Sequence, residues 1–150
     1  MCIRDRLPES QQDSYEAYEA MLTNDALQSA NLAHGRVVFE CTCGVCHRMY
    51  GQGGAVGPDL TGSNRTNLDY VLSNVISPGE VMQDDYRMVI VTTRGGRTYI
   101  GTVAAENERQ VTLRVVGQDT VVLNRSDIQS LEISEQSLMP EGLFLSLIHI

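Results

Sequence analysis

Two cysteines and a histidine stand in the order Cys-x-x-Cys-His at Cys43, Cys46 and His47. This spacing is typical of a c-type haem attachment site, in which each thiol forms a thioether with one vinyl group of the haem. The histidine that follows the second cysteine then lies beneath the iron and ligates it. The sequence therefore predicts one covalent haem c per chain, tethered by Cys43 and Cys46 and ligated by His47.

The same residue types can serve other chemistries. A zinc site would use ligands from residues 41–47, but structural zinc sites usually combine two ligand pairs, and no second Cys/His pair follows. A redox-active Cys-x-x-Cys pair is expected near a βαβ pattern, which this sequence lacks. The haem interpretation is therefore favoured, and a zinc-stabilised adaptor module remains the alternative.

A second axial ligand is expected towards the end of the chain. Met139 precedes Pro140, which fixes the local backbone, and a methionine thioether is a known ligand of haem iron. Met82 is a rival by its distance along the sequence, whereas Met49 is too close to the attachment site to reach the opposite face. A methionine that only packs in the core is the ordinary alternative for any of them.

Helices must position these residues. Asn31 is expected to cap a helix that runs to about Cys41, immediately before the cysteine pair. Gly35 and Phe39 share a face of this helix, where another helix could cross closely at the glycine. Asn67 is expected to open a further helix, which a Ser-Pro-Gly sequence at residues 77–79 ends.

A glycine-rich segment, residues 51–60, lies between these two helices and is too rich in glycine for regular structure. It lacks the lysine of a phosphate-binding loop. A metal-bound histidine needs an acceptor for its other ring nitrogen, and a backbone carbonyl of this segment would serve. We therefore expect the segment to support His47.

From Tyr86 onwards the sequence alternates with a period of two, which favours β-strands. Short strands separated by tight turns predict an antiparallel meander curled into a small barrel. It contains no histidine, cysteine or carboxylate pair, so it is interpreted as a structural insertion. The predicted strands cover residues 86–92, 98–104, 110–116, 120–124 and 128–133.

Composition limits the classes of function. Apolar residues make up 42% of the 150 residues and charged residues 20%, as in an ordinary globular protein. The net charge of -8, without a cluster of Lys or Arg, disfavours nucleic acid as a partner. No apolar run reaches the length that spans a membrane.

Together these motifs resemble the planctomycete-type haem-binding cytochrome c domain, from about Ala33 to Leu143. The resemblance implies an α+β fold, a helical cytochrome c-like haem domain interrupted by a small five-stranded antiparallel β meander or barrel. The motifs that carry it are Gly35-Arg36-Val37-Val38-Phe39, the Cys43 to His47 run, Gly53 to Leu60, Asn67-Leu68-Asp69-Tyr70, Tyr86-Arg87 and Ser137 to Leu143.

The resemblance also implies roles for single residues. His47 and Met139 are expected as axial ligands, with Pro58 behind the histidine and Gly57 and Leu60 also lining the haem. It further implies a periplasmic or exported location and a place at the C-terminal end of a larger dehydrogenase-like protein. The expected function is electron transfer to or from a redox partner protein or an upstream domain, without catalysis of its own.

The domain organisation follows the same resemblance. Residues 1–32 are interpreted as sequencing-adapter-like residues plus a linker, as at the edges of metagenomic fragments, and 145–150 as adapter-like residues. The cytochrome part covers 33–83 and 134–144, and the β subdomain covers 84–133. Two functions remain as alternatives: a haem-based ligand sensor, in which Met139 leaves the iron to admit a gas, and the zinc-stabilised adaptor.

Overall fold

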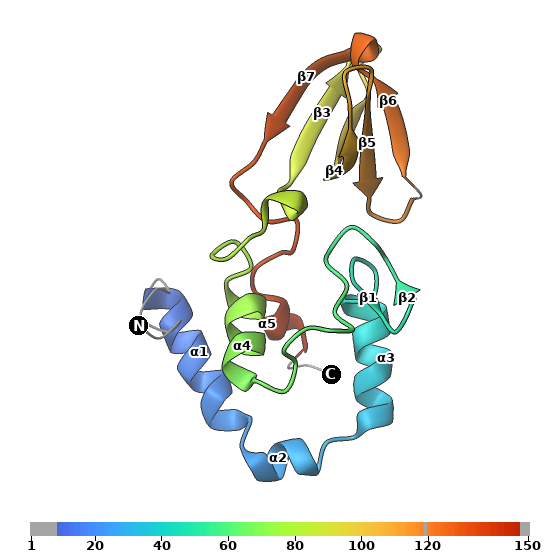
Figure 1. Ribbon diagram of the computed structural model, residues 1–150. Coiled ribbons are helices and arrows are strands. Elements are labelled where there is room, and N and C mark those ends of the chain that lie inside the picture. Colours follow the sequence, from blue (N-terminus) through green and yellow to red (C-terminus); the bar gives the residue numbers. More distant parts are fainter. Residues whose placement is uncertain (1–8, 119, 148–150) are drawn as a thin grey trace.

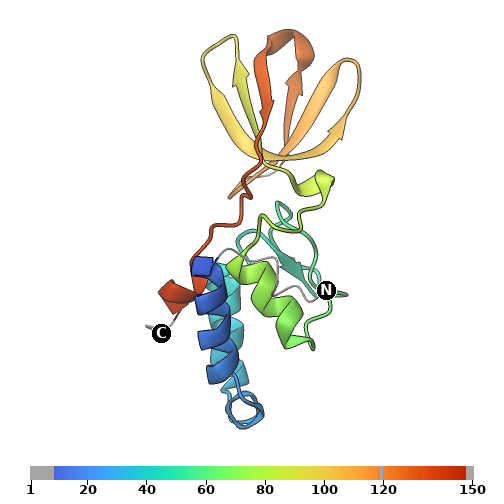
Figure 2. The same cartoon turned by 90° about the vertical axis from the view of Figure 1, so that its left-hand side faces the viewer.

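The computed structural model describes residues 9–118 and 120–147; of the segments 1–32 and 145–150, which were interpreted as containing adapter-like residues, residues 1–8 and 148–150 lie outside that part of the chain. A β-sheet occupies one end and short helices the other, joined by the segments that enter and leave the sheet (Figures 1 and 2). The helices are α1 (Glu9–Met21), α2 (Asn24–Gln28), α3 (Leu32–Thr42), α4 (Leu68–Ile76) and α5 (Leu143–Leu147), with 3₁₀ turns η2 (Asp84–Tyr86) and η3 (Arg125–Asp127). The strands are β1 (Arg48–Met49), β2 (Gln52–Gly53), β3 (Val89–Thr93), β4 (Thr98–Glu106), β5 (Gln110–Val115), β6 (Val121–Asn124) and β7 (Ile128–Ile133).

Two helices begin where the sequence predicts. The Asn31 side chain accepts a hydrogen bond from the His34 amide (3.0 Å), and the Asn67 side chain accepts one from the Tyr70 amide (3.0 Å). Each asparagine satisfies an amide that the first helical turn leaves without a partner. Both predicted N-caps are therefore confirmed.

A small helical core forms between α1 and α4. Tyr15 of α1 is buried with Leu72 and Ile76 of α4, and its hydroxyl donates to an Asp69 carboxylate oxygen at 2.8 Å. Phe144 of α5 packs against the same cluster. The segment interpreted as a linker thus packs against the protein. None of the helices within residues 9–118 and 120–147 is long and apolar enough to cross a membrane.

Helix α3 stands apart from this core. It contains no buried residue, and a Cβ built on Gly35 would meet no atom within 4 Å outside its own helix. The close helix crossing expected at Gly35 is therefore not present in the described part of the chain.

The prediction of a helical cytochrome c-like fold is wrong. Only 34% of the structure is helical, the helices are short, and the largest ordered unit is a five-stranded antiparallel sheet. The motifs behind the prediction fix where helices start and how a loop folds back, which are local properties. They do not determine which helices pack together, and Tyr15 directs α1 onto α4 while α3 stays outside that core.

The sheet has the strand order β6-β5-β4-β3-β7. Strands β3 to β6 form a meander, but β7 pairs with β3 instead of β6, so the chain crosses one end of the sheet through η3. The sheet core consists of buried residues from β3, β5 and β6, against which the partly buried Tyr99, Val103 and Leu131 pack. Its fully or nearly fully buried members are Val89, Val91, Val111, Leu113 and Leu123.

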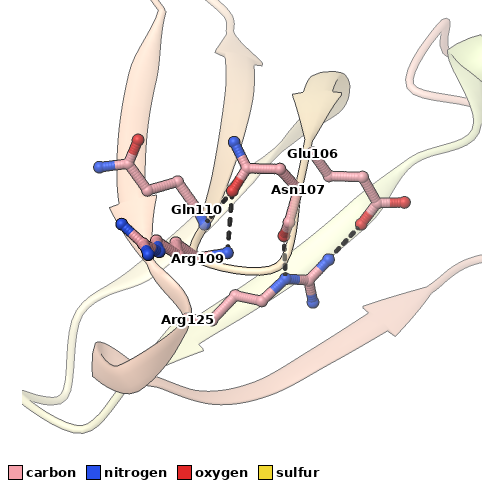
Figure 3. Close-up of polar contacts among 5 residues, drawn as sticks. All are labelled: Glu106, Asn107, Arg109, Gln110 and Arg125. Atoms are coloured by element: carbon pink, nitrogen blue, oxygen red, sulfur yellow. Dashed lines mark hydrogen bonds and ion pairs between the residues drawn. The ribbon is translucent and has the colours of Figure 1, made fainter.

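Arg125 of η3 fastens this crossing to the β4–β5 turn (Figure 3). Its Nε donates to the Asn107 carbonyl at 2.7 Å and its Nη2 to a Glu106 carboxylate oxygen at 2.6 Å. The Asn107 side chain in turn accepts from the amides of Arg109 (2.8 Å) and Gln110 (2.9 Å), which fixes the turn. The clamp joins strands that are not neighbours in the sheet.

Candidate functional site

The Cys-x-x-Cys-His segment continues the last turn of α3. The amides of Cys46 (3.1 Å) and His47 (2.8 Å) both donate to the Cys43 carbonyl, so the three side chains stand three and four residues apart on a helical turn. The local fold therefore places Cys46 and His47 each about one helical turn beyond Cys43.

Both thiols are reduced and half-buried. Desolvation raises the pKa of Cys43, and the neighbouring Cys46 raises it further, while burial alone raises the pKa of Cys46. The two sulfurs are therefore protonated thiols at neutral pH. Cys41, the third cysteine of this segment, is exposed.

The His47 ring is held by the glycine-rich segment. Its Nδ1 lies 2.9 Å from the Pro58 carbonyl oxygen, the geometry of a ring N–H that donates to a backbone acceptor. This bond places the proton on Nδ1 and leaves the lone pair on Nε2, the nitrogen that would ligate a metal. The backbone acceptor expected from the sequence is thus present, on Pro58.

Glycines allow the supporting segment to lie directly against the Cys-x-x-Cys-His backbone. A Cβ on Gly57 would lie 2.7 Å from His47 Cε1 and 2.8 Å from Nδ1, closer than real side chains approach. A Cβ on Gly54 would collide with the Val45 carbonyl. Backbone hydrogen bonds from Gly54 to the Gly44 carbonyl and from Gly57 to the Cys46 carbonyl, both 2.8 Å, hold the two segments together.

A polar cluster closes the base of this loop, and sequence reasoning missed it. Arg65 donates to the Tyr50 hydroxyl (3.1 Å) and the Thr61 carbonyl (2.9 Å), and its guanidinium carbon lies 5.3 Å from the centre of the Tyr50 ring. Arg65 also contacts the Met49 sulfur at 3.5 Å. The Leu60 amide donates to the Arg48 carbonyl at 2.8 Å at the same base.

The Asp59-x-Thr61 spacing was the available signal for this cluster, since an aspartate often accepts from the residue two positions on. The Thr61 hydroxyl (2.5 Å) and amide (2.8 Å) both donate to the same Asp59 oxygen. These two bonds hold the pKa of Asp59 below its ordinary value, and the bond from the Thr61 hydroxyl has the larger effect. The carboxylate therefore stabilises the loop at neutral pH.

We expect Thr61→Val to return the pKa of Asp59 towards its ordinary value, because the variant removes the larger of the two stabilising hydrogen bonds. Since the folded pKa is depressed, the stabilisation is present above the unfolded pKa and is lost as pH falls through the folded value. A carboxyl-carbon NMR titration measures this shift. Thr66→Val, at an exposed threonine of the next turn, is the control and should leave the Asp59 titration unchanged.

Met139 lies apart from the cysteines and His47. It is half-buried, and its amide donates to the Ser137 hydroxyl at 3.1 Å. It lines a cavity of about 310 Å³ together with Pro78, Gly79, Gln136, Ser137, Pro140 and Glu141, and neither the cysteines nor His47 belongs to that lining. The structure thus brings Cys43, Cys46, His47, Gly57 and Pro58 together, whereas it does not bring Met139 to them.

Comparison with known proteins adds no relative: no family model and no curated protein matches the chain. Within residues 9–118 and 120–147, no three His, Cys, Asp or Glu side chains gather closely enough to hold a metal ion among themselves. The observed donors do fit a haem c. They comprise two free thiols and an imidazole within about one turn of the chain, with the imidazole fixed by a carbonyl and packed against a glycine.

Proposed function

We propose that this chain binds one haem c covalently through Cys43 and Cys46, with His47 as an axial ligand, and that it transfers electrons. The observation that carries the proposal is the hydrogen bond from His47 Nδ1 to the Pro58 carbonyl, together with Gly57 against the ring. An imidazole held in this way is oriented before any ligand arrives, which is the usual role of an outer partner of a metal-binding histidine.

The two thiols supply the attachment. Thioether formation would add each S–H across a vinyl double bond: the double bond would become single, sulfur would bond to one carbon and hydrogen to the other, so no oxidant or reductant would be consumed. The raised pKa values of Cys43 and Cys46 keep those hydrogens in place at neutral pH, and the absence of a bond between the two sulfurs leaves both available. When bound, the haem supplies an iron that changes oxidation state by one electron.

For the sixth position we propose Met139, with Met82 as its rival. Both methionines are half-buried, and Pro140 restricts the backbone beside Met139. Met49 is too close along the chain to the attachment site to reach the opposite face, and its sulfur contacts Arg65. With both axial positions filled the iron offers no open site to a substrate, which supports electron transfer in place of catalysis.

The proposed setting is periplasmic or exported, because c-type attachment is made there, as the resemblance described above implies. The partner is a redox protein or a dehydrogenase-like domain of a larger protein. The net charge of -8 suits a partner with a basic surface.

Expression of the chain in a host that matures c-type cytochromes tests the proposal. The denatured protein should keep haem-linked peroxidase staining on a gel, and acid-acetone should not strip the colour. Cys43→Ala should leave at most one thioether, whereas the matched Cys41→Ala should leave both, because Cys41 is exposed and lies outside the Cys-x-x-Cys pair.

Other outcomes would contradict the proposal. A protein that binds stoichiometric zinc and shows no Soret band is a zinc-stabilised adaptor. A reduced haem protein that takes up carbon monoxide at once has an available sixth position and is a ligand sensor.

A further inference from the structure

The β-sheet contacts the glycine-rich segment through one buried hydrogen bond. The Thr102 hydroxyl of β4 donates to the Val56 carbonyl at 3.2 Å, across 46 residues of sequence. Thr102 is 1% exposed and Val56 is 5% exposed. In Figure 1 the segment that follows β2 rises towards the lower end of the sheet.

Thr102 is not buried by the core of its own sheet. Its neighbour Val103 packs against that core, and successive side chains of a strand point to opposite faces. Thr102 therefore lies on the other face, where Val56 meets it. A buried hydroxyl on a face outside the sheet core calls for a polar partner, and the Val56 carbonyl is that partner.

Three successive residues of the segment are held from three directions. The Val56 carbonyl accepts from Thr102, the Gly57 amide donates to the Cys46 carbonyl at 2.8 Å, and the Pro58 carbonyl accepts from His47. A shift of Val56 would therefore move the glycine that packs on the imidazole and the carbonyl that orients it.

We propose that Thr102 is a positioning residue for His47, and that the β-sheet is part of the histidine site in place of an inert insertion. The sheet holds Val56, and Val56 sets the two residues that fix the imidazole. The proposed role in haem ligation rests on the function proposed above, whereas the effect on the His47 ring does not, because it exists in the chain without haem.

The test uses the full chain without haem and three variants. Thr102→Val removes the hydroxyl at nearly constant shape, Thr102→Ser keeps it, and Thr98→Val removes an exposed hydroxyl from the same strand. The readouts are the exchange rate of the Gly57 amide and the ring-nitrogen shifts of His47. The amides of Val111 and Leu113 in β5 report on the sheet itself.

Thr102→Val should speed exchange at Gly57 by about tenfold, the effect of losing one buried hydrogen bond, and should shift the His47 ring nitrogens. In Thr102→Ser and Thr98→Val the exchange rate of the Gly57 amide should stay within about twofold of its value in the unmodified chain. The exchange rates of the two β5 amides in Thr102→Val should stay within the same limit.

An unchanged exchange rate of the Gly57 amide in Thr102→Val would overturn the proposal. An equal rise in the exchange rates of Gly57 and of the β5 amides would also overturn it, because it would assign Thr102 to sheet packing alone. If Thr102→Val does not fold, Thr102→Ser decides, because loosening of Gly57 despite the retained hydroxyl also overturns it. Absence of haem from the mature original chain would refute the proposed function while leaving this result intact.

Discussion

Gly57→Ala should release the His47 ring from the Pro58 carbonyl. The added Cβ would lie 2.7 Å from the imidazole carbon Cε1, so either the ring tilts or the segment withdraws, and both movements break a hydrogen bond of 2.9 Å. Forcing one extra carbon into a closely packed site costs about 1–3 kcal/mol. We expect this cost to appear as a His47 ring that no longer keeps its proton on Nδ1.

Nitrogen-15 NMR of the His47 ring measures the effect in the chain without haem. Gly62→Ala is the matched control, since a Cβ there would meet nothing within 4 Å and its backbone φ lies outside the left-handed region. If the chain binds haem as proposed, Gly57→Ala should keep the covalent colour, because the cysteines would hold the haem, while the histidine would no longer be firmly placed. A His47 spectrum identical to that of the original chain would show that the packing at Gly57 does not orient the ring.

Leu113→Ala should cause the largest loss of folding stability. Leu113 is fully buried at the centre of the sheet core, and truncation of a leucine in such a site costs about 2–5 kcal/mol. Small domains have total stabilities of about 5–15 kcal/mol, so the variant removes a large share of what holds the sheet. Native-state hydrogen exchange of the β4 and β5 amides measures this loss strand by strand.

Val122→Ala in β6 is the control for that measurement, because its side chain is 54% exposed and should change the stability by less than about 0.5 kcal/mol. A Leu113→Ala protein with unchanged β4 and β5 exchange would contradict the assignment of the core. Its exchange pattern also shows whether loss of the sheet spreads to the amides of the glycine-rich segment.

Local features of the fold were predictable from the sequence, and long-range ones were not. Asn31 and Asn67 predict helix starts because each side chain accepts a hydrogen bond from a backbone amide only three residues further along the chain. The last strand was predicted at 128–133 and is found there, because its alternation and flanking turns are local signals. Its pairing with β3 depends on contacts across the sheet, which no short window of sequence contains.

The candidate site divides in the same way. The cysteines and His47 are recognisable by spacing, and a backbone acceptor for the ring could be expected from general metal chemistry. Thr102 gave no signal, because a threonine in a strand is ordinary and its partner Val56 lies 46 residues earlier. The role of Arg65 was also not predicted. Its partners are the Tyr50 hydroxyl and the Thr61 carbonyl, and an uncharged partner of this kind does not indicate in the sequence that an arginine binds it.

The pairing of β7 with β3 brings the two ends of the sheet unit together. Val89 and Ile133 are register partners, and the Ser134 amide donates to the Met88 carbonyl at 2.8 Å. The sheet unit therefore enters and leaves the rest of the chain at two points that its own hydrogen bonds hold close together. A flexible segment of the same length would impose an entropic cost of closure, whereas here the unit's own ladder fixes the distance between entry and exit. A unit with this construction sets the spacing of the two flanking chain segments from within, so the residues between Thr93 and Ile128 can change in length without moving those segments apart.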